Sequence, residues 1–194
     1  GYGRVPYARN LHWALWYYRD GRFKWWLDRI ERAGQYAPYD PAIEPVQWDD
    51  LAGATIFEMH PELYEYTSNY ADYGGEVTPP NVPLEDCFDK IAFREGIEMD
   101  AEYFLLDGFS RGKHLQYDGN CIIKYFADGR DWLIDGDYLV RNTTDHNGVS
   151  VVRDGRVAEL IPSCVALDAI ADLPTATLTE TTVRDYNGCD WIRN

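Results

Sequence analysis

The chain has 194 residues, 45% hydrophobic and 15% aromatic, so it is long and apolar enough to fold around a core. Acidic residues outnumber basic ones by 33 to 18, and the net charge of −15 argues against general binding to nucleic acids or anionic membranes. The four cysteines contain no Cys-x-x-Cys pair, which leaves a zinc ribbon or a thioredoxin-type motif unsupported, and no apolar run is long enough to insert across a membrane.

The first part of the chain has the periodicity of helices. In residues 7–33, apolar side chains recur at three- and four-residue spacing on both sides of Asp20-Gly21. Because an Asp-Gly pair breaks a helix, we expect two helices packed as a hairpin. Residues 34–90 contain two proline-punctuated stretches and only weak periodicity, which predicts an extended connection with short helical or strand pieces.

From residue 91 onward, short alternating segments predict β-strands. These segments lie at 102–108, 120–126, 131–140, 149–153 and 156–160. Asp128-Gly129 and Asp154-Gly155 are turn dipeptides that favour tight hairpins between neighbouring strands. This half is typical of an antiparallel β-sandwich or part of one, and with the helices before it the fold class is α+β.

A two-residue loop at Asp128-Gly129 also predicts which side chains face the core. Simple alternation away from the loop pairs Tyr125 with Trp132 and Ile123 with Ile134. That face is apolar, so we expect it to be buried. The opposite face is more polar and includes Asp135, so it could host a site.

One polar row stands out within the stretch GKHLQYDGN at residues 112–120. His114, Gln116 and Asp118 occupy every second position, so in an extended chain their side chains share one face. To approach Asp135 the chain has to bend before the next strand, and Gly119 is the expected hinge. His146 begins another candidate strand and could approach the same surface. The plain alternative is a solvated sheet face without a function.

Taken in order, these segments resemble the heparinase II/III-like proteins. The resemblance rests on Arg94, YFLLD at 103–107, His114, Asp118, Asp135 with Gly136, His146-Asn147 and the Gly-x-Asp-Trp-x-Arg motif at 188–193. It implies that residues 1–87 are the C-terminal end of an (α/α) toroid with a connecting segment. Residues 88–194 would then be the N-terminal part of the family's β-sandwich domain, in a chain cut at both ends.

The resemblance implies β-eliminative cleavage of an acidic, uronic-acid-containing polysaccharide. In such lyases a base removes the proton α to the uronate carboxylate, while hydrogen-bond donors neutralise that carboxylate. It implies His114 as a catalytic residue on the substrate side, with Asp118 and Asn147 binding substrate. The family's tyrosine base comes from toroid helices that mostly precede residue 1, so we expect this chain alone to be inactive. Secretion or a periplasmic location is also implied, although the chain carries no signal peptide.

Several members of this family bind a structural zinc ion through three positions. Their counterparts here are Gln116, Asp135 and His146. Gln116 departs from the family pattern, since zinc prefers Cys, His or carboxylate ligands and a neutral amide oxygen is a poor substitute. We therefore expect zinc to be weak or absent, and Gln116 to hydrogen-bond to Asp135 or His146 instead.

Two other functions fit the same residues. A non-catalytic carbohydrate-binding or scaffold module would use the acidic face and the aromatic side chains to hold a neutral glycan. A hydrolase would use paired carboxylates such as Asp118 and Asp135. The sequence does not identify the polysaccharide, although the net charge mildly disfavours the most heavily sulfated ones.

Overall fold

The structure of the chain is a computed structural model. It describes residues 6–29, 42–47, 52–65, 80–98, 100–110, 117–135, 143, 146–157, 161–173 and 176–194. The chain divides into two compact units, residues 1–51 and 52–194, which we describe separately. Within the described ranges, no helix combines the length and the apolar character needed to cross a bilayer.

The first unit contains the predicted helical hairpin. Its helices are α1 (Pro6–Tyr18) and α2 (Gly21–Arg29), and the break falls at the expected place. The Asp20 carboxylate begins α2 by accepting the backbone N–H of Arg22 at 2.9 Å, as helix N-caps do. Leu15 and Leu27 are buried between the helices. The prediction of two helices interrupted at Asp20-Gly21 is confirmed.

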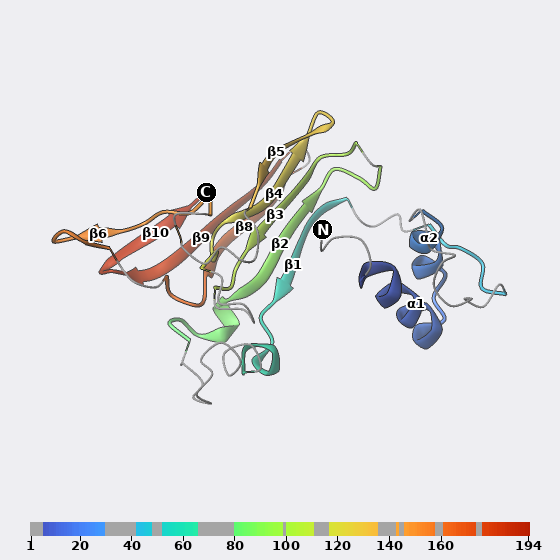
Figure 1. The fold of residues 1–194 in the computed structure, drawn as a ribbon, viewed down its shortest axis with the longest axis horizontal. Helices are drawn as coiled ribbons and strands as arrows, with labels where there is room; N and C mark the ends of the chain where they lie inside the picture. The colour runs from blue at the N-terminus through green and yellow to red at the C-terminus, as the bar shows by residue number, and fades with distance from the viewer. Residues whose placement is uncertain are drawn as a thin grey trace. The chain divides into compact units, whose positions relative to one another are not determined.

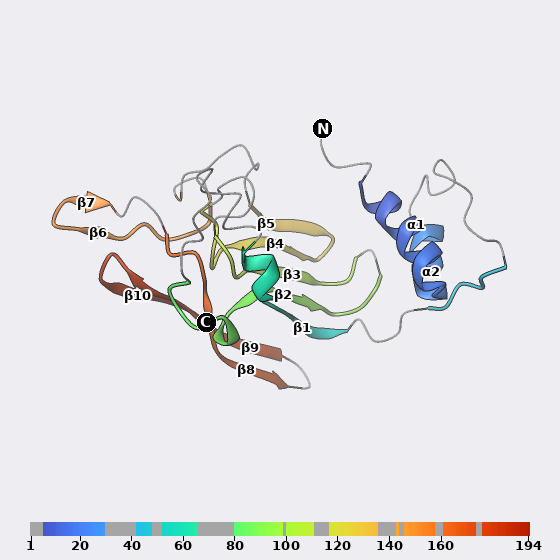
Figure 2. The same ribbon diagram turned by 90° about the horizontal axis from the view of Figure 1, so that it is seen from below.

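The second unit is built from antiparallel strands (Figure 1, Figure 2). A five-stranded sheet has the order β1 (Gly53–Glu58), β2 (Phe88–Arg94), β3 (Tyr103–Asp107), β4 (Ile122–Ala127), β5 (Arg130–Ile134). A three-stranded sheet has the order β10 (Cys189–Arg193), β9 (Ala176–Tyr186), β8 (Ala166–Leu173), and β6 (Val152–Arg153) pairs with β7 (Arg156–Val157). Helical turns are short here: residues 61–65 and the 3-10 helix η3 (Leu84–Asp86). The chain is therefore a mixed protein with few helices and antiparallel sheets, which agrees with the α+β class.

Three hairpins turn on residue pairs that both have positive φ. The pairs are Asp128-Gly129 (φ 53° and 72°), Asp154-Gly155 (51° and 73°) and Asn187-Gly188 (56° and 76°). Two consecutive positive φ values define the turn whose twist matches that of paired strands, and Asp-Gly and Asn-Gly are the dipeptides that adopt it at least cost. The two hairpins predicted from Asp-Gly are confirmed.

The predicted register between β4 and β5 is correct only beside the turn. Ala127 pairs with Arg130 as expected, but the pairing then slips by one residue, so that Tyr125 faces Leu133 rather than Trp132. A β-bulge places one extra residue in one strand and reverses which side chains face the core beyond it. Simple alternation therefore fails after a few residues.

The consequence for burial is a second correction. Trp132 and Ile134, which we predicted to be buried, are 49% and 65% exposed. A further shift in register between β3 and β4 leaves Ile123 as the extra residue, and Ile122 packs against the main core instead. Each bulge is defined by the pairing with the neighbouring strand, so the sequence of one strand alone does not mark it.

One core joins the two larger sheets. Its fully buried members come from β2, β3 and β9 and from the segment before β8: Phe88, Ile91, Leu106, Ile161, Val165, Val183 and Tyr186. The strand β1, which lies in the segment that the sequence assigns to a connection, pairs with β2 along its length. The sheets and their connections thus fold as one unit, and the loops at the end of this core carry the site described next.

Candidate metal centre

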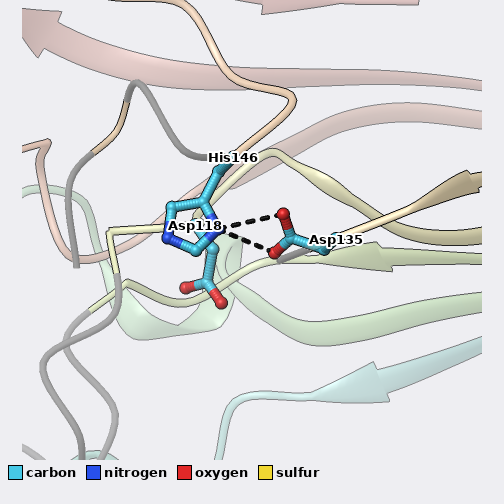
Figure 3. A group of neighbouring side chains, drawn as sticks. All are labelled: Asp118, Asp135 and His146. Atoms are coloured by element: carbon cyan, nitrogen blue, oxygen red, sulfur yellow. Dashed lines mark hydrogen bonds and ion pairs between the residues drawn. The ribbon is translucent and has the colours of Figure 1, made fainter. Parts of the chain in front are cut away.

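Three side chains from separate segments meet beside the core (Figure 3). Asp118 lies just before β4, Asp135 just after β5, and His146 in the loop before β6. One ligand atom from each residue lies within 4.8 Å of those of the other two. The structure thus brings together Asp135 and His146, which the resemblance places at one site, and it adds Asp118, which the resemblance assigns to substrate.

A tight turn positions Asp118. The backbone N–H of Cys121 donates to the Asp118 carbonyl at 2.9 Å, and Asn120 adopts a φ of 64°. Gly119 donates its N–H to the hydroxyl oxygen of Ser110 at 2.8 Å, and a Cβ on Gly119 would lie only 2.4 Å from that oxygen. The chain therefore bends where we expected, but the residue with the left-handed backbone conformation is Asn120. Gly119 is needed because a side chain at that position would collide with Ser110.

Asn120 ties this turn to both sheets. It is completely buried, and its N–H donates to the Asp107 carbonyl at the end of β3 at 2.8 Å. Its side-chain oxygen accepts the hydroxyl proton of Thr181 from β9 at 2.7 Å. Asn tolerates the left-handed conformation better than most residues because its short side chain can hydrogen-bond locally. Asp118 is thus held on a rigid support.

Asp135 and His146 contact each other directly. The Nδ1 atom of His146 lies 2.9 Å from both carboxylate oxygens of Asp135, and the two side chains are only 0% and 7% exposed, respectively. The backbone N–H of Asp135 donates to the Ile123 carbonyl at 2.9 Å, which fixes the start of its loop. The Nε2 atom of His146 is buried and has no hydrogen-bond partner among the residues that the structure describes. A buried nitrogen without a partner costs about 1–3 kcal/mol, and a cation bound at this site would supply a partner for Nε2.

The charges around Asp118 also favour a cation. Burial, reinforced by the nearby charge of Asp107, raises the pKa of Asp118 to about 7, while His146 opposes this shift. Lys90 forms a 2.9 Å ion pair with Asp107 and so balances the charge of that carboxylate. Asp118 and Asp135 both lie close to the His146 ring. Two carboxylates in one buried place repel each other unless a proton or a metal ion lies between them. One imidazole and two carboxylates form a donor set that suits Zn²⁺ or Mn²⁺.

Asn147, to which the resemblance assigns substrate binding, makes two hydrogen bonds to the backbone of β4. The side-chain oxygen of Asn147 accepts the N–H of Ile122 at 2.7 Å, and its nitrogen donates to the Ile122 carbonyl at 2.5 Å. The Asn147 side chain therefore pairs with the first residue of β4 as a neighbouring strand would. These two hydrogen bonds anchor the loop that carries His146. His114 and Gln116 lie outside the described residues, and so does the predicted hydrogen bond from Gln116.

Comparison with known proteins adds no relative. No family model matches the chain, and no curated protein or solved structure matches it. The similarity to heparinase II/III-like proteins therefore rests on motifs and their order. The meeting of Asp118, Asp135 and His146 is an observation independent of that similarity.

Proposed function

We propose that this chain is part of a polysaccharide lyase of the heparinase II/III-like type. In this proposal the antiparallel sheets form the N-terminal part of the β-sandwich domain, and α1 and α2 are the end of the (α/α) toroid. The observation that carries the proposal is the contact between Asp135 and His146. The resemblance pairs these two residues at one cation site, although they come from different loops.

In this proposal Asp118, Asp135 and His146 hold a divalent cation. When bound, the cation neutralises the two buried carboxylates and ties together the chain before β4, the chain after β5 and the loop before β6. Asp118 provides a charged oxygen where the family pattern has a second histidine and this chain has Gln116. A set with one nitrogen and two carboxylates is less suited to zinc than a histidine-rich set, so the cation is exchangeable.

The cation site in this proposal is structural, and catalysis belongs to His114. His114 precedes Asp118 in the same short stretch, so fixing Asp118 restrains the chain beside the catalytic residue. On the substrate, a base removes the proton α to the uronate carboxylate, and an acid protonates the leaving glycosidic oxygen. A site that must hold His114 within about 0.5 Å of its productive place benefits from such support.

The proposed substrate is a uronate polysaccharide with few sulfate groups. The carboxylate on the sugar is required for elimination, because it makes the α proton acidic enough to be removed once the charge is neutralised. The net charge of −15 disfavours a polyanion with additional sulfate groups.

Elimination can be tested directly because it creates a carbon–carbon double bond in the product. We expect the full-length protein to generate ultraviolet-absorbing unsaturated uronate from at least one member of a panel of uronate polysaccharides. The variant His114→Ala should lose turnover and retain binding. New reducing ends without ultraviolet absorbance would indicate a hydrolase that uses Asp118 and Asp135, and binding without turnover would indicate a carbohydrate-binding module.

A further inference from the structure

Two of the four cysteines lie together in a buried cluster away from the candidate metal centre. Cys87 and Cys164 are 6% and 0% exposed and belong to a small core with Met59, Tyr64 and Phe109. The other two cysteines are isolated from this cluster: Cys121 is buried next to the Asp118 turn, and Cys189 is exposed on β10. The chain therefore contains one close cysteine pair and two internal controls.

The backbone places the two side chains on one face. Cys87, just before β2, pairs with Ala166 at the start of β8 in an antiparallel bridge. Side chains of paired residues point to the same side, and residues two apart in a strand share a face. Cys164 precedes Ala166 by two residues, so its side chain is the diagonal neighbour of Cys87.

Both backbones are held in place independently of the sulfur atoms. The amide side chain of Asn81 makes two hydrogen bonds to the backbone of Cys164, accepting its N–H at 2.8 Å and donating to its carbonyl at 2.9 Å. Cys164 also bridges to Phe109. The N–H of Cys87 donates to the Leu84 carbonyl at 3.1 Å, where η3 ends. The backbones at Cys87 and Cys164 are therefore held in place by contacts that do not involve sulfur.

The Cys87 thiol donates to the Pro83 carbonyl at 3.3 Å, and the two thiols also affect each other's pKa. The hydrogen bond between them raises the pKa of Cys87 and lowers the pKa of Cys164, which stabilises the thiolate of Cys164. In contrast, burial raises the pKa of Cys121, whose neighbours include Asp135 and Asp118. Because the thiolate is the nucleophile in disulfide exchange, Cys164 is the sulfur that reacts first.

We propose that Cys87 and Cys164 form a disulfide bond when the chain folds in the presence of a disulfide oxidant such as oxidised glutathione. The Cys164 thiolate attacks one sulfur of the oxidant, forms a mixed disulfide and releases one glutathione thiolate. The Cys87 thiol then loses its proton and attacks the Cys164 sulfur, which releases the second glutathione. The protein loses two protons and two electrons, and the oxidant becomes two thiols.

Such a bond would join the segments that lead into the two larger sheets. Cys87 precedes β2 and Cys164 precedes β8, so the bond closes a loop of roughly 80 residues in the unfolded chain. A cross-link of this span restricts the unfolded chain strongly. For a protein of this size we expect the melting temperature to rise on the order of 10 °C.

The test is oxidative refolding of the complete chain. Denatured, reduced protein is refolded with a mixture of reduced and oxidised glutathione, free thiols are then alkylated in denaturant, and the digest is analysed by mass spectrometry. We expect a linked peptide pair containing Cys87 and Cys164, with Cys121 and Cys189 alkylated. This measurement uses the unsubstituted protein, so it does not depend on a variant that folds.

Thermal melting of oxidised and reduced protein provides the second readout. The rise in melting temperature should persist in Cys121→Ala and Cys189→Ser and be absent in Cys164→Ala. If Cys87 and Cys164 are recovered alkylated at the most oxidising glutathione ratio, the proposal is wrong. It is equally wrong if either of them is found linked mainly to Cys121 or Cys189.

Discussion

At the scale of single residues, Asp118 determines how the metal-free site responds to pH. Its folded-state pKa of about 7 lies above the usual value of about 3.9, because the carboxyl is buried near Asp107. A raised pKa means that the folded state holds the proton more tightly than the unfolded state. The stability that the neutral acid provides is therefore fully present below about pH 3.9 and is lost as the pH rises through 7.

The variant Asp118→Asn removes this dependence, since an amide of nearly the same shape stays neutral. In the presence of a chelator, we expect the variant to be more stable than the unsubstituted protein at pH 8, by on the order of 3 kcal/mol. The difference should shrink toward zero near pH 4. Urea unfolding at a series of pH values measures it, with the exposed Asp131→Asn as the control. A difference that does not change with pH would contradict the assignment.

Asp135 and His146 should determine the affinity for the cation. We expect Zn²⁺ to be lost on exhaustive dialysis and to rebind reversibly when it is added back. Asp135→Asn and His146→Ala should each lower the affinity at least about tenfold, because each removes one of few ligands. Isothermal titration calorimetry measures the affinity, and Asp131→Asn should bind as the unsubstituted protein does. Stoichiometric zinc that survives dialysis would show that the site is stronger than we infer.

The sequence allowed part of this site to be predicted. Asp135 and His146 could be paired because they stand in a recognisable order of motifs. The bend that brings Asp118 to them was expected at Gly119, but nothing in the alternating polar row assigns Asp118 to the cation rather than to the substrate. The turn depends on Asn120, whose left-handed conformation is supported by partners in β3 and β9. Those partners are distant in the sequence, so no local pattern contains them.

At the scale of elements, features determined by adjacent residues were predictable from the sequence, and features determined by a distant strand were not. The hairpins at Asp128-Gly129 and Asp154-Gly155 were predictable, since two adjacent residues determine the turn. The bulges in β4 and β5 were not, since an extra residue such as Ile123 or Trp132 is visible only against the partner strand. An apolar residue is therefore weak evidence of burial in a sheet whose pairing is irregular.

Gly119 provides a test of how the turn before β4 packs against the end of β3. A Cβ at this position would lie 2.4 Å from the Ser110 hydroxyl oxygen and 3.3 Å from a methyl group of Val165. We expect Gly119→Ala to lower the free energy of unfolding by about 2 kcal/mol, as overpacking does. Gly96→Ala is the matched control, because nothing lies within 4 Å of its Cβ. Chemical denaturation measures the free energy of unfolding of both variants. Equal stabilities would show that the turn can shift to accommodate the added methyl group.

At the scale of the whole molecule, the two units differ in what holds them together. Among the described residues of the first unit, only Leu15 and Leu27 are buried hydrophobic side chains. Its large aromatic side chains on α1 are mostly exposed: Trp13, Trp16, Tyr17 and Tyr18. Helices of this length are marginal in water without a larger packed face. The second unit has two core clusters and the candidate cation site.

We therefore predict that residues 52–194, produced alone, fold and bind the cation as the complete chain does. Their thermal unfolding should be cooperative, with a melting temperature within a few degrees of the main transition of the complete chain, since the buried side chains that support the sheets are retained. Residues 1–51 alone should show little helix by circular dichroism, because a short helical hairpin buries too little apolar surface to offset its loss of conformational entropy. Calorimetric titration with Zn²⁺ supplies the functional comparison. A non-cooperative melt or a lost cation site in residues 52–194 would mean that the helical unit is needed to complete the sheets.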